Sequence, residues 1–388
     1  APGANGYGGS SGESYVVFGA AGGFSAALSV LDLDGSNGFR LDGVEANELS
    51  GRSVSGAGDF NGDGFADLLV GQPAAGGGVG ASFVLFGAAA GIGAASIATG
   101  DLDGTDGFVL TGVDGGDQAG LSVSDAGDVN GDGFGDILIG APNGDGLAGA
   151  ETGETYVVFG LAAGFGATVN LSTLTGANGF RIDGRVNYDI SGYSVSSAGD
   201  INGDGISDIL IGAYAANSNY GEAYVVFGST AGFAATINLN GLTGANGFTL
   251  AYSAAPYSGS NFARSVSNIG DINGDGIDDI ALGAPTTYAS AGKTFILFGT
   301  DAGFAASVDV SALDGADGFI VNGVDIGENN GASVSGAGDI NGDGFDDFIV
   351  GAYRANNSAG GLNVGESYVV FGSGAGFAAT FELSSIDG

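Results

Sequence analysis

Five copies of one acidic motif, each set among the same short apolar segments, predict an all-β protein: a β-propeller of four-stranded antiparallel blades, with five full repeats and a partial one. The copies begin 69, 72, 71 and 68 residues apart, which is too long for helical solenoids and suits a large blade. The apolar segments are rich in Val, Ile, Phe and Tyr and are separated by Gly, Asn, Asp and Ser, as strands and turns are. We expect a single propeller domain over residues 1–388, with a flexible N-terminal segment at residues 1–12.

Each repeat contains four expected strands. The first precedes the acidic motif, as in GRSVSGAG at 51–58, and the second follows it, as in DLLVG at 67–71. The third is typified by ETYVVFG at 154–160 and the fourth by GFRIDG at 179–184. The second and third are almost continuously apolar, as inner strands covered on both faces are, whereas the fourth alternates and is expected to be more exposed. The variable insert at 161–178 is expected to be a long outer loop with one helical turn.

The strand count leaves a surplus. The third strand type occurs six times, at Tyr15, Phe83, Tyr156, Tyr224, Phe295 and Tyr368, and the other types occur five times. The fourth-type strand at 38–43 could complete the last blade, but the strand at 15–19 would then have no vacancy. Three explanations stay open: a sixth, incomplete blade, an edge that pairs with another chain, or missing flanking sequence.

Composition excludes several classes of function. The 388 residues include no Cys, His, Met or Trp, so there are no disulfides and no thiolate or imidazole ligands, and any metal must be held by oxygen. A net charge of −37 argues against nucleic acid and anionic membrane partners. No apolar run reaches the length of a membrane span, so no membrane insertion is expected. The first residues lack the features of a signal peptide, which fits a mature secreted product or a segment of a longer protein.

The oxygens of each acidic motif are spaced to surround a cation. In the first copy Asp59, Asn61 and Asp63 are two residues apart and Asp67 follows four later, so that one tight loop can turn these side chains toward one point. The backbone carbonyl of Phe65 would add a ligand. Hard and mostly anionic oxygen ligands suit Ca²⁺ better than Zn²⁺ or Mg²⁺. The alternative, hydrogen-bonded Asp and Asn turns, would leave three crowded carboxylates uncompensated.

The repeat resembles a known family. YVVFG at 156–160 and LIGAP at 138–142, with the acidic loop before the latter, are similar to the FG-GAP repeats of the integrin α-subunit N-terminal β-propeller and its bacterial secreted relatives. The resemblance covers about residues 13–383 and implies blades around an axis with calcium loops on one rim. Integrin propellers have seven blades, whereas five acidic loops occur here.

The resemblance also implies about five calcium ions, one for each loop at residues 59–67, 128–136, 200–208, 271–279 and 339–347. The implied ligands are Asp59, Asn61, Asp63, Phe65, Asp67, Asp128, Asn130, Asp132, Phe134, Asp136, Asp200, Asn202, Asp204, Ile206, Asp208, Asp271, Asn273, Asp275, Ile277, Asp279, Asp339, Asn341, Asp343, Phe345 and Asp347. Extracellular calcium modules bind at about 10⁻⁴ to 10⁻³ M, so the loops indicate a secreted or cell-surface location.

The expected function is non-enzymatic: a calcium-stabilised extracellular structural or adhesive propeller that binds a protein or glycan, or associates with copies of itself through the surplus N-terminal strand, at a bacterial surface, matrix or filament. A partner rim is suggested by loop tyrosines at positions 188, 214, 220, 252, 257, 288 and 353. One alternative is a non-catalytic domain of a larger secreted enzyme or toxin. Another is a carboxylate-dependent glycan-active enzyme, for which the candidates are Glu45, Glu48, Asp114, Asp117, Asp189, Asp325 and Glu328, although their recurrence favours a generic loop.

Overall fold

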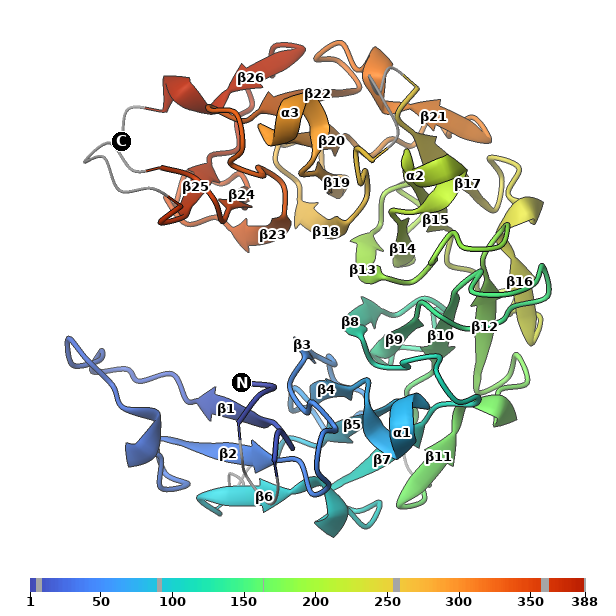
Figure 1. The fold of residues 1–388 in the computed structure, drawn as a ribbon, viewed down its shortest axis with the longest axis vertical. Helices are drawn as coiled ribbons and strands as arrows, with labels where there is room; N and C mark the ends of the chain where they lie inside the picture. Colours follow the sequence, from blue (N-terminus) through green and yellow to red (C-terminus); the bar gives the residue numbers. More distant parts are fainter. Residues whose placement is uncertain (5–8, 89–92, 163, 254–258, 357–362, 387–388) are drawn as a thin grey trace.

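The protein is an all-β, propeller-like array, as predicted. The computed structural model describes residues 1–4, 9–88, 93–162, 164–253, 259–356 and 363–386. Six sheets follow one another around an arc, with the N-terminal and C-terminal sheets at its two ends (Figure 1). The α-helical segments of the described chain are single turns of four residues: α1 (Ala75–Gly78), α2 (Ala216–Asn219) and α3 (Thr287–Ser290). No described helix has the length and apolar character needed to span a membrane.

Four of the sheets have five strands. We number the sheets 1 to 6 in chain order and list strands from the inner to the outer edge. Sheet 2 comprises β3 (Ser53–Gly56), β4 (Leu68–Gln72), β5 (Ala81–Leu85), β7 (Gly107–Thr111) and β11 (Thr168–Asn170). Sheet 3 comprises β8 (Ser122–Gly127), β9 (Asp136–Ala141), β10 (Glu154–Val158), β12 (Gly179–Asp183) and β16 (Thr236–Asn238). Sheet 4 comprises β13 (Ser194–Gly199), β14 (Asp208–Ala213), β15 (Glu222–Val226), β17 (Gly247–Ala251) and β21 (Ser307–Asp309). Sheet 5 comprises β18 (Ser265–Gly270), β19 (Asp279–Ala284), β20 (Lys293–Leu297), β22 (Gly318–Asn322) and β26 (Thr380–Glu382).

The sheets at the two ends have three strands each. Sheet 1 comprises β1 (Glu13–Val17), β2 (Gly38–Asp42) and β6 (Ser96–Ala98), and sheet 6 comprises β23 (Ser333–Gly338), β24 (Asp347–Ala352) and β25 (Glu366–Val370). β2 pairs with β1 and not with the last sheet, so the closure considered from the sequence is not formed. The surplus strand, β1, belongs to sheet 1, which brings the number of sheets to six and has only three strands. The flexibility predicted for residues 1–12 stays a prediction.

The five-stranded sheets contain one strand more than the four antiparallel strands that the sequence predicts. The insert between the third and fourth strands contributes a three-residue strand followed by a 3₁₀ turn, and this strand joins the sheet of the preceding repeat in parallel orientation. In sheet 3, for example, Thr236 of β16 lies opposite Arg181 of β12. Such a strand is too short to produce a recognisable sequence period, and it links each repeat to the one before it.

The fourth strands alternate as predicted, and their exposure is confined to alternate side chains: Arg181 of β12 is partly exposed, whereas every residue of the third strand β10 is buried. Phe180 and Ile182 of β12 are fully buried, because the added outer strand brings a phenylalanine from the next insert onto them. The rings of Phe180 and Phe233 stack with centroids 4.2 Å apart. The same stack recurs in the neighbouring sheets, as Phe108 with Phe165, Phe248 with Phe304 and Phe319 with Phe377. The hydrophobic core therefore lies between neighbouring sheets and includes the apolar side chains of their fourth strands.

Serine hydroxyls join the innermost strands of neighbouring sheets. The Oγ of Ser194 accepts the backbone N–H of Val266 at 3.2 Å, and the Oγ of Ser196 accepts that of Asn268 at 3.2 Å. Equivalent bonds run from sheet 2 to sheet 3, from sheet 3 to sheet 4 and from sheet 5 to sheet 6. The Ser-Val-Ser pattern thus supplies hydrogen-bond acceptors to the inner edges of β8, β13, β18 and β23 from the preceding sheet.

Candidate cation-binding loops

Each acidic motif connects the first and second strands of its sheet. In sheet 3 the loop leaves β8 after Gly127 and enters β9 at Asp136, and these two residues are register partners across a β-bulge. Sheets 4, 5 and 6 have the same bulge at the same place. The motif residues therefore lie in a short hairpin loop whose ends are fixed by strand pairing.

Within each loop the acidic and amide side chains bend back onto the loop. In the loop at 128–136, Oδ2 of Asp128 accepts the N–H of Gly133 at 2.8 Å, and Oδ1 of Asn130 accepts the N–H of Asp132 at 2.8 Å. Oδ1 of Asp132 accepts the N–H of Phe134 at 3.0 Å. Gly133 has φ of +92°, in the left-handed region that glycine adopts without strain, which allows the chain to curl around these side chains.

The first aspartate adopts the same arrangement in all five loops. Its Oδ2 accepts the N–H of the glycine five residues later, at Gly64, Gly133, Gly205, Gly276 and Gly344, over distances of 2.8 to 3.0 Å. In all five loops the carboxylate at the first predicted ligand position is thus turned back onto the loop backbone. The exposed fifth position, for example Asp132, faces solvent.

The ninth position has a structural role that the sequence analysis missed. Its aspartate is buried in every loop, and its Oδ1 accepts the N–H of the glycine that ends the YVVFG-type segment: Gly87, Gly160, Gly228, Gly299 or Gly372. The fixed order of the acidic motif and the Phe-Gly pair in each repeat was the available signal. This bond ties the loop to the end of the third strand.

The loops carry negative charge, and no salt bridge among the described residues involves one of their carboxylates. Burial, together with a smaller contribution from repulsion by the carboxylates of Asp132 and Asp128, raises the pKa of Asp136 to about 7. Burial and the same kind of repulsion raise the pKa of Asp208 and that of Asp279 to about 8. Two buried oxygens, Oδ1 of Asp59 and Oδ2 of Asp208, have no hydrogen-bond partner among the described residues. A bound cation would satisfy these oxygens and offset the repulsion.

The coordination sphere is not assembled in this conformation. Among the described residues, no three acidic side chains lie close enough together to hold a metal. The loop oxygens instead accept backbone N–H groups, as in hydrogen-bonded turns. The predicted ligands are nevertheless all oxygen and mostly anionic, and this chemistry fits Ca²⁺. The unpartnered buried oxygens of Asp59 and Asp208 stand at position one of the first loop and position nine of the third.

The acidic residues considered for catalysis act mainly as turn caps. Glu48, Asp117, Asp189 and Glu328 are buried, and each accepts a backbone N–H from the start of its own loop at 3.0 or 3.1 Å. Glu45, Asp114 and Asp325 are exposed in the same loops. The generic-loop interpretation explains the recurrence of these residues.

The loop tyrosines do not form one rim. Tyr188 and Tyr353 are exposed, whereas Tyr252 is buried in the core of sheets 4 and 5. Tyr214 packs edge-on against Tyr193, with the guanidinium of Arg264 over both rings. Tyr257 and the side chain of Tyr288 lie outside the described residues.

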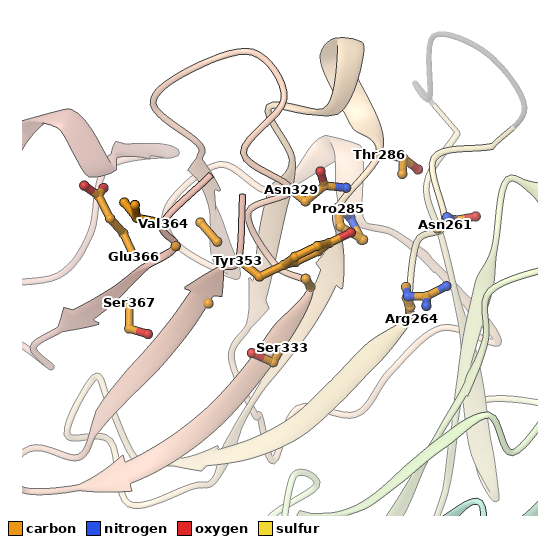
Figure 2. Close-up of a pocket in the computed structure, with 14 residues that line it drawn as sticks. Asn261, Arg264, Pro285, Thr286, Asn329, Ser333, Tyr353, Val364, Glu366 and Ser367 are labelled. Atoms are coloured by element: carbon orange, nitrogen blue, oxygen red, sulfur yellow. The ribbon is translucent and has the colours of Figure 1, made fainter. Parts of the chain in front are cut away.

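One pocket combines aromatic and polar groups. It has a volume of about 780 Å³ and lies between the loops of sheets 5 and 6, where Tyr353 extends across it toward the side on which Asn261 and Arg264 lie (Figure 2). Asn329 and Glu366 contribute polar groups to its wall. The residues suit a polar ligand with an aromatic contact on one face.

Repeated blades with an acidic hairpin loop in the same place define a propeller-like repeat protein. Comparison with known families agrees with this class. The model of the FG-GAP repeat matches residues 50–85, 121–158, 191–226, 262–297 and 330–370, so each match includes one acidic loop. The chain is an FG-GAP repeat protein that resembles integrin α subunits.

Similar curated proteins include integrin alpha-PS2 of Drosophila melanogaster, which is 30% identical over 234 residues, or 59% of this chain and 15% of that protein. Integrin alpha pat-2 of Caenorhabditis elegans is 30% identical over 244 residues, or 61% of this chain and 18% of that protein. Integrin alpha-4 of Xenopus laevis is 29% identical over 161 residues, or 42% of this chain and 14% of that protein. The chain thus spans less than a fifth of the length of these relatives.

Proposed function

We propose that this chain is a calcium-stabilised, non-catalytic extracellular propeller that mediates adhesion at a bacterial surface or matrix. The observation that carries the proposal is the recurrence, in five acidic loops, of a buried aspartate that forms no salt bridge within the described part of the chain. About five calcium ions, one per loop, would bind the residues predicted as ligands. When bound, each ion would supply positive charge and brace the hairpin between the first two strands of its sheet.

The location follows from the same loops. Modules of this kind reach saturation only where free calcium is high, which means outside the cell. The absence of cysteine fits a protein that folds without disulfides in such an environment. A secreted or surface-attached protein is therefore the location that we propose.

The partner that we propose is a protein, by analogy with the integrin α relatives. The pocket around Tyr353 supports a partner that offers polar groups and a flat apolar face (Figure 2). A glycan has the same properties and is the second ligand class to screen. A non-catalytic domain of a larger secreted enzyme or toxin would use the same surface.

Self-association is a second candidate function, favoured by two sheet edges. β1 and β25 are edge strands in the described structure, and Val17 of β1 is 42% exposed, whereas the equivalent Leu85 and Val158 are buried. Unpaired edges accept strands from other chains. Light scattering of the purified chain in calcium gives the test: a concentration-dependent increase in mass supports self-association, and a monomer at all concentrations rejects it.

Thermal unfolding with and without calcium tests the main proposal. We expect the melting temperature of the chelator-stripped chain to rise with calcium, because an ion bound only to the folded state stabilises it. A variant with alanine at the fifth position of all five loops, D63A/D132A/D204A/D275A/D343A, is the control and is expected not to respond. An equal response of both proteins, or of neither, would contradict calcium stabilisation through these loops.

A further inference from the structure

The five acidic loops touch one another around the arc. The N–H of the eighth residue of one loop donates to the carbonyl of the first residue of the preceding loop, as Ser207 does to Asp128 and Asp346 to Asp271, both at 3.2 Å. Phe345 packs its ring against Gly274 of the preceding loop, where a Cβ would lie 2.3 Å from the ring. Neighbouring loops are therefore in direct contact through backbone hydrogen bonds and side-chain packing.

Two of these contacts include an additional carboxylate. Oδ2 of Asp278 accepts the N–H of Asp200 at 2.8 Å, and Oδ2 of Asp346 accepts the N–H of Asp271 at 3.0 Å. These bonds span 78 and 75 residues, from one sheet to the next. The residue before Asp200 must be glycine, since a Cβ on Gly199 would lie 2.1 Å from Oδ2 of Asp278.

The eighth position differs among the loops. It is alanine, glycine and serine in the first three loops, at Ala66, Gly135 and Ser207, and aspartate in the last two. The carboxylate link therefore joins the loops at 200–208, 271–279 and 339–347. No described side-chain bond of this kind joins the loop at 128–136 to its neighbours.

We propose that Asp278 and Asp346 couple cation binding between neighbouring loops, so that the last three loops fill cooperatively and the first two fill independently. This inference rests on the proposed calcium function. Asp278 stands between the predicted ligand positions Ile277 and Asp279 of its own loop and holds the backbone of Asp200, the first predicted ligand of the preceding loop. An ion that orders either loop would restrain the other through this bond.

Charge acts in the same direction. The carboxylate of Asp278 lies beside the acidic loop at 200–208 and adds a like charge to it. An ion bound in that loop would offset this repulsion and so favour the conformation in which Asp278 holds Asp200. Asp278 and Asp346 are positioning residues here, because neither is a predicted ligand.

The test is a calcium titration of the full chain in which amide NMR monitors binding. Gly133, Gly205 and Gly276 donate to the first aspartate of three different loops, so their amide resonances report the filling of each loop. The variant D275A removes a predicted ligand from the loop at 271–279. We expect D275A to weaken calcium binding reported by Gly205 at least about fivefold and to leave Gly133 unchanged.

The matched variant is D278S, which places at this position the residue that the preceding loop carries at Ser207. In D278S, the substitution D275A is expected no longer to change the midpoint at Gly205. In D278N, which keeps an acceptor oxygen, the effect of D275A is expected to persist. Two results would overturn the coupling. One is that D275A still shifts the calcium midpoint at Gly205 fivefold when D278S is also present. The other is that D275A alone leaves this midpoint unchanged. Absence of saturable shifts at all three glycines in the unmodified chain would instead overturn the calcium proposal and the coupling with it.

Discussion

Asp136 joins its loop to the end of the third strand of sheet 3, because its Oδ1 accepts the N–H of Gly160 at 3.0 Å. Its Oδ2 accepts the N–H of Val129 at 2.9 Å. Both donors are buried, so they have no access to solvent as an alternative partner. One carboxylate thus satisfies the backbone of two elements and also stands at a predicted ligand position.

Replacement of this carboxylate should destabilise the protein even without calcium. We expect D136A to cost about 2 kcal/mol in chelator, since two buried N–H groups lose their acceptor. The control is D132A in the same loop, whose exposed side chain accepts bonds from solvent-accessible groups and whose loss should cost less than about 1 kcal/mol. Urea unfolding of both variants in EDTA measures the difference, and equal effects would contradict the structural role of Asp136.

The charge state of Asp189 should produce a defined pH dependence. Burial raises the pKa of Asp189 from 3.8 to about 6, so the folded state holds this proton more tightly than the unfolded state. The stability that this residue contributes is therefore present below about pH 4 and lost as pH rises through about 6. D189N keeps an acceptor for the N–H of Val186 but cannot ionise.

We accordingly expect D189N to be more stable than the unmodified chain by about 1 to 2 kcal/mol at pH 7.5 and to match it at pH 4. Melting temperatures of both proteins across this range measure the difference. A difference that does not change with pH would show that ionisation of Asp189 has no effect on stability.

The stacked phenylalanines should contribute to the contact between repeats. Phe233 stacks on Phe180 of the preceding sheet at 4.2 Å, so F233A is expected to cost about 2 to 3 kcal/mol. Phe24 occupies the corresponding position of the first insert and is 62% exposed, which makes F24A a matched control with a cost near zero. Similar losses for both variants in thermal unfolding would contradict the role of the stack.

Loss of a serine hydrogen bond between the innermost strands should destabilise the protein less than loss of a stacked phenylalanine. S194A removes the acceptor for the N–H of Val266 and is expected to cost about 1 kcal/mol. Ser335, which takes in sheet 6 the place that Ser196 takes in sheet 4, bonds only within its own strand in the described structure, so S335A is the control and should change stability little. A loss for S335A as large as that for S194A would argue against this link.

The local features of the repeat were predictable from the sequence, but most contacts between repeats were not. The glycines of each acidic loop and the spacing of Asp128, Asn130 and Asp132 predict the loop and its donors. The partners of β16 and Phe233 lie in the preceding repeat, and no local period indicates which repeat a three-residue strand will join. The bond from Asp136 to Gly160 was missed although both residues lie in one repeat, since it links segments 24 residues apart.

Isothermal titration calorimetry of calcium binding to the chelator-stripped chain tests the central claim most directly. Saturable binding of about five ions is expected, with affinities in the range of extracellular modules. The variant with alanine at the fifth position of every loop should bind few or none. Absence of saturable binding by the unmodified chain, or unchanged binding by the variant, would contradict the assignment of these loops as calcium sites.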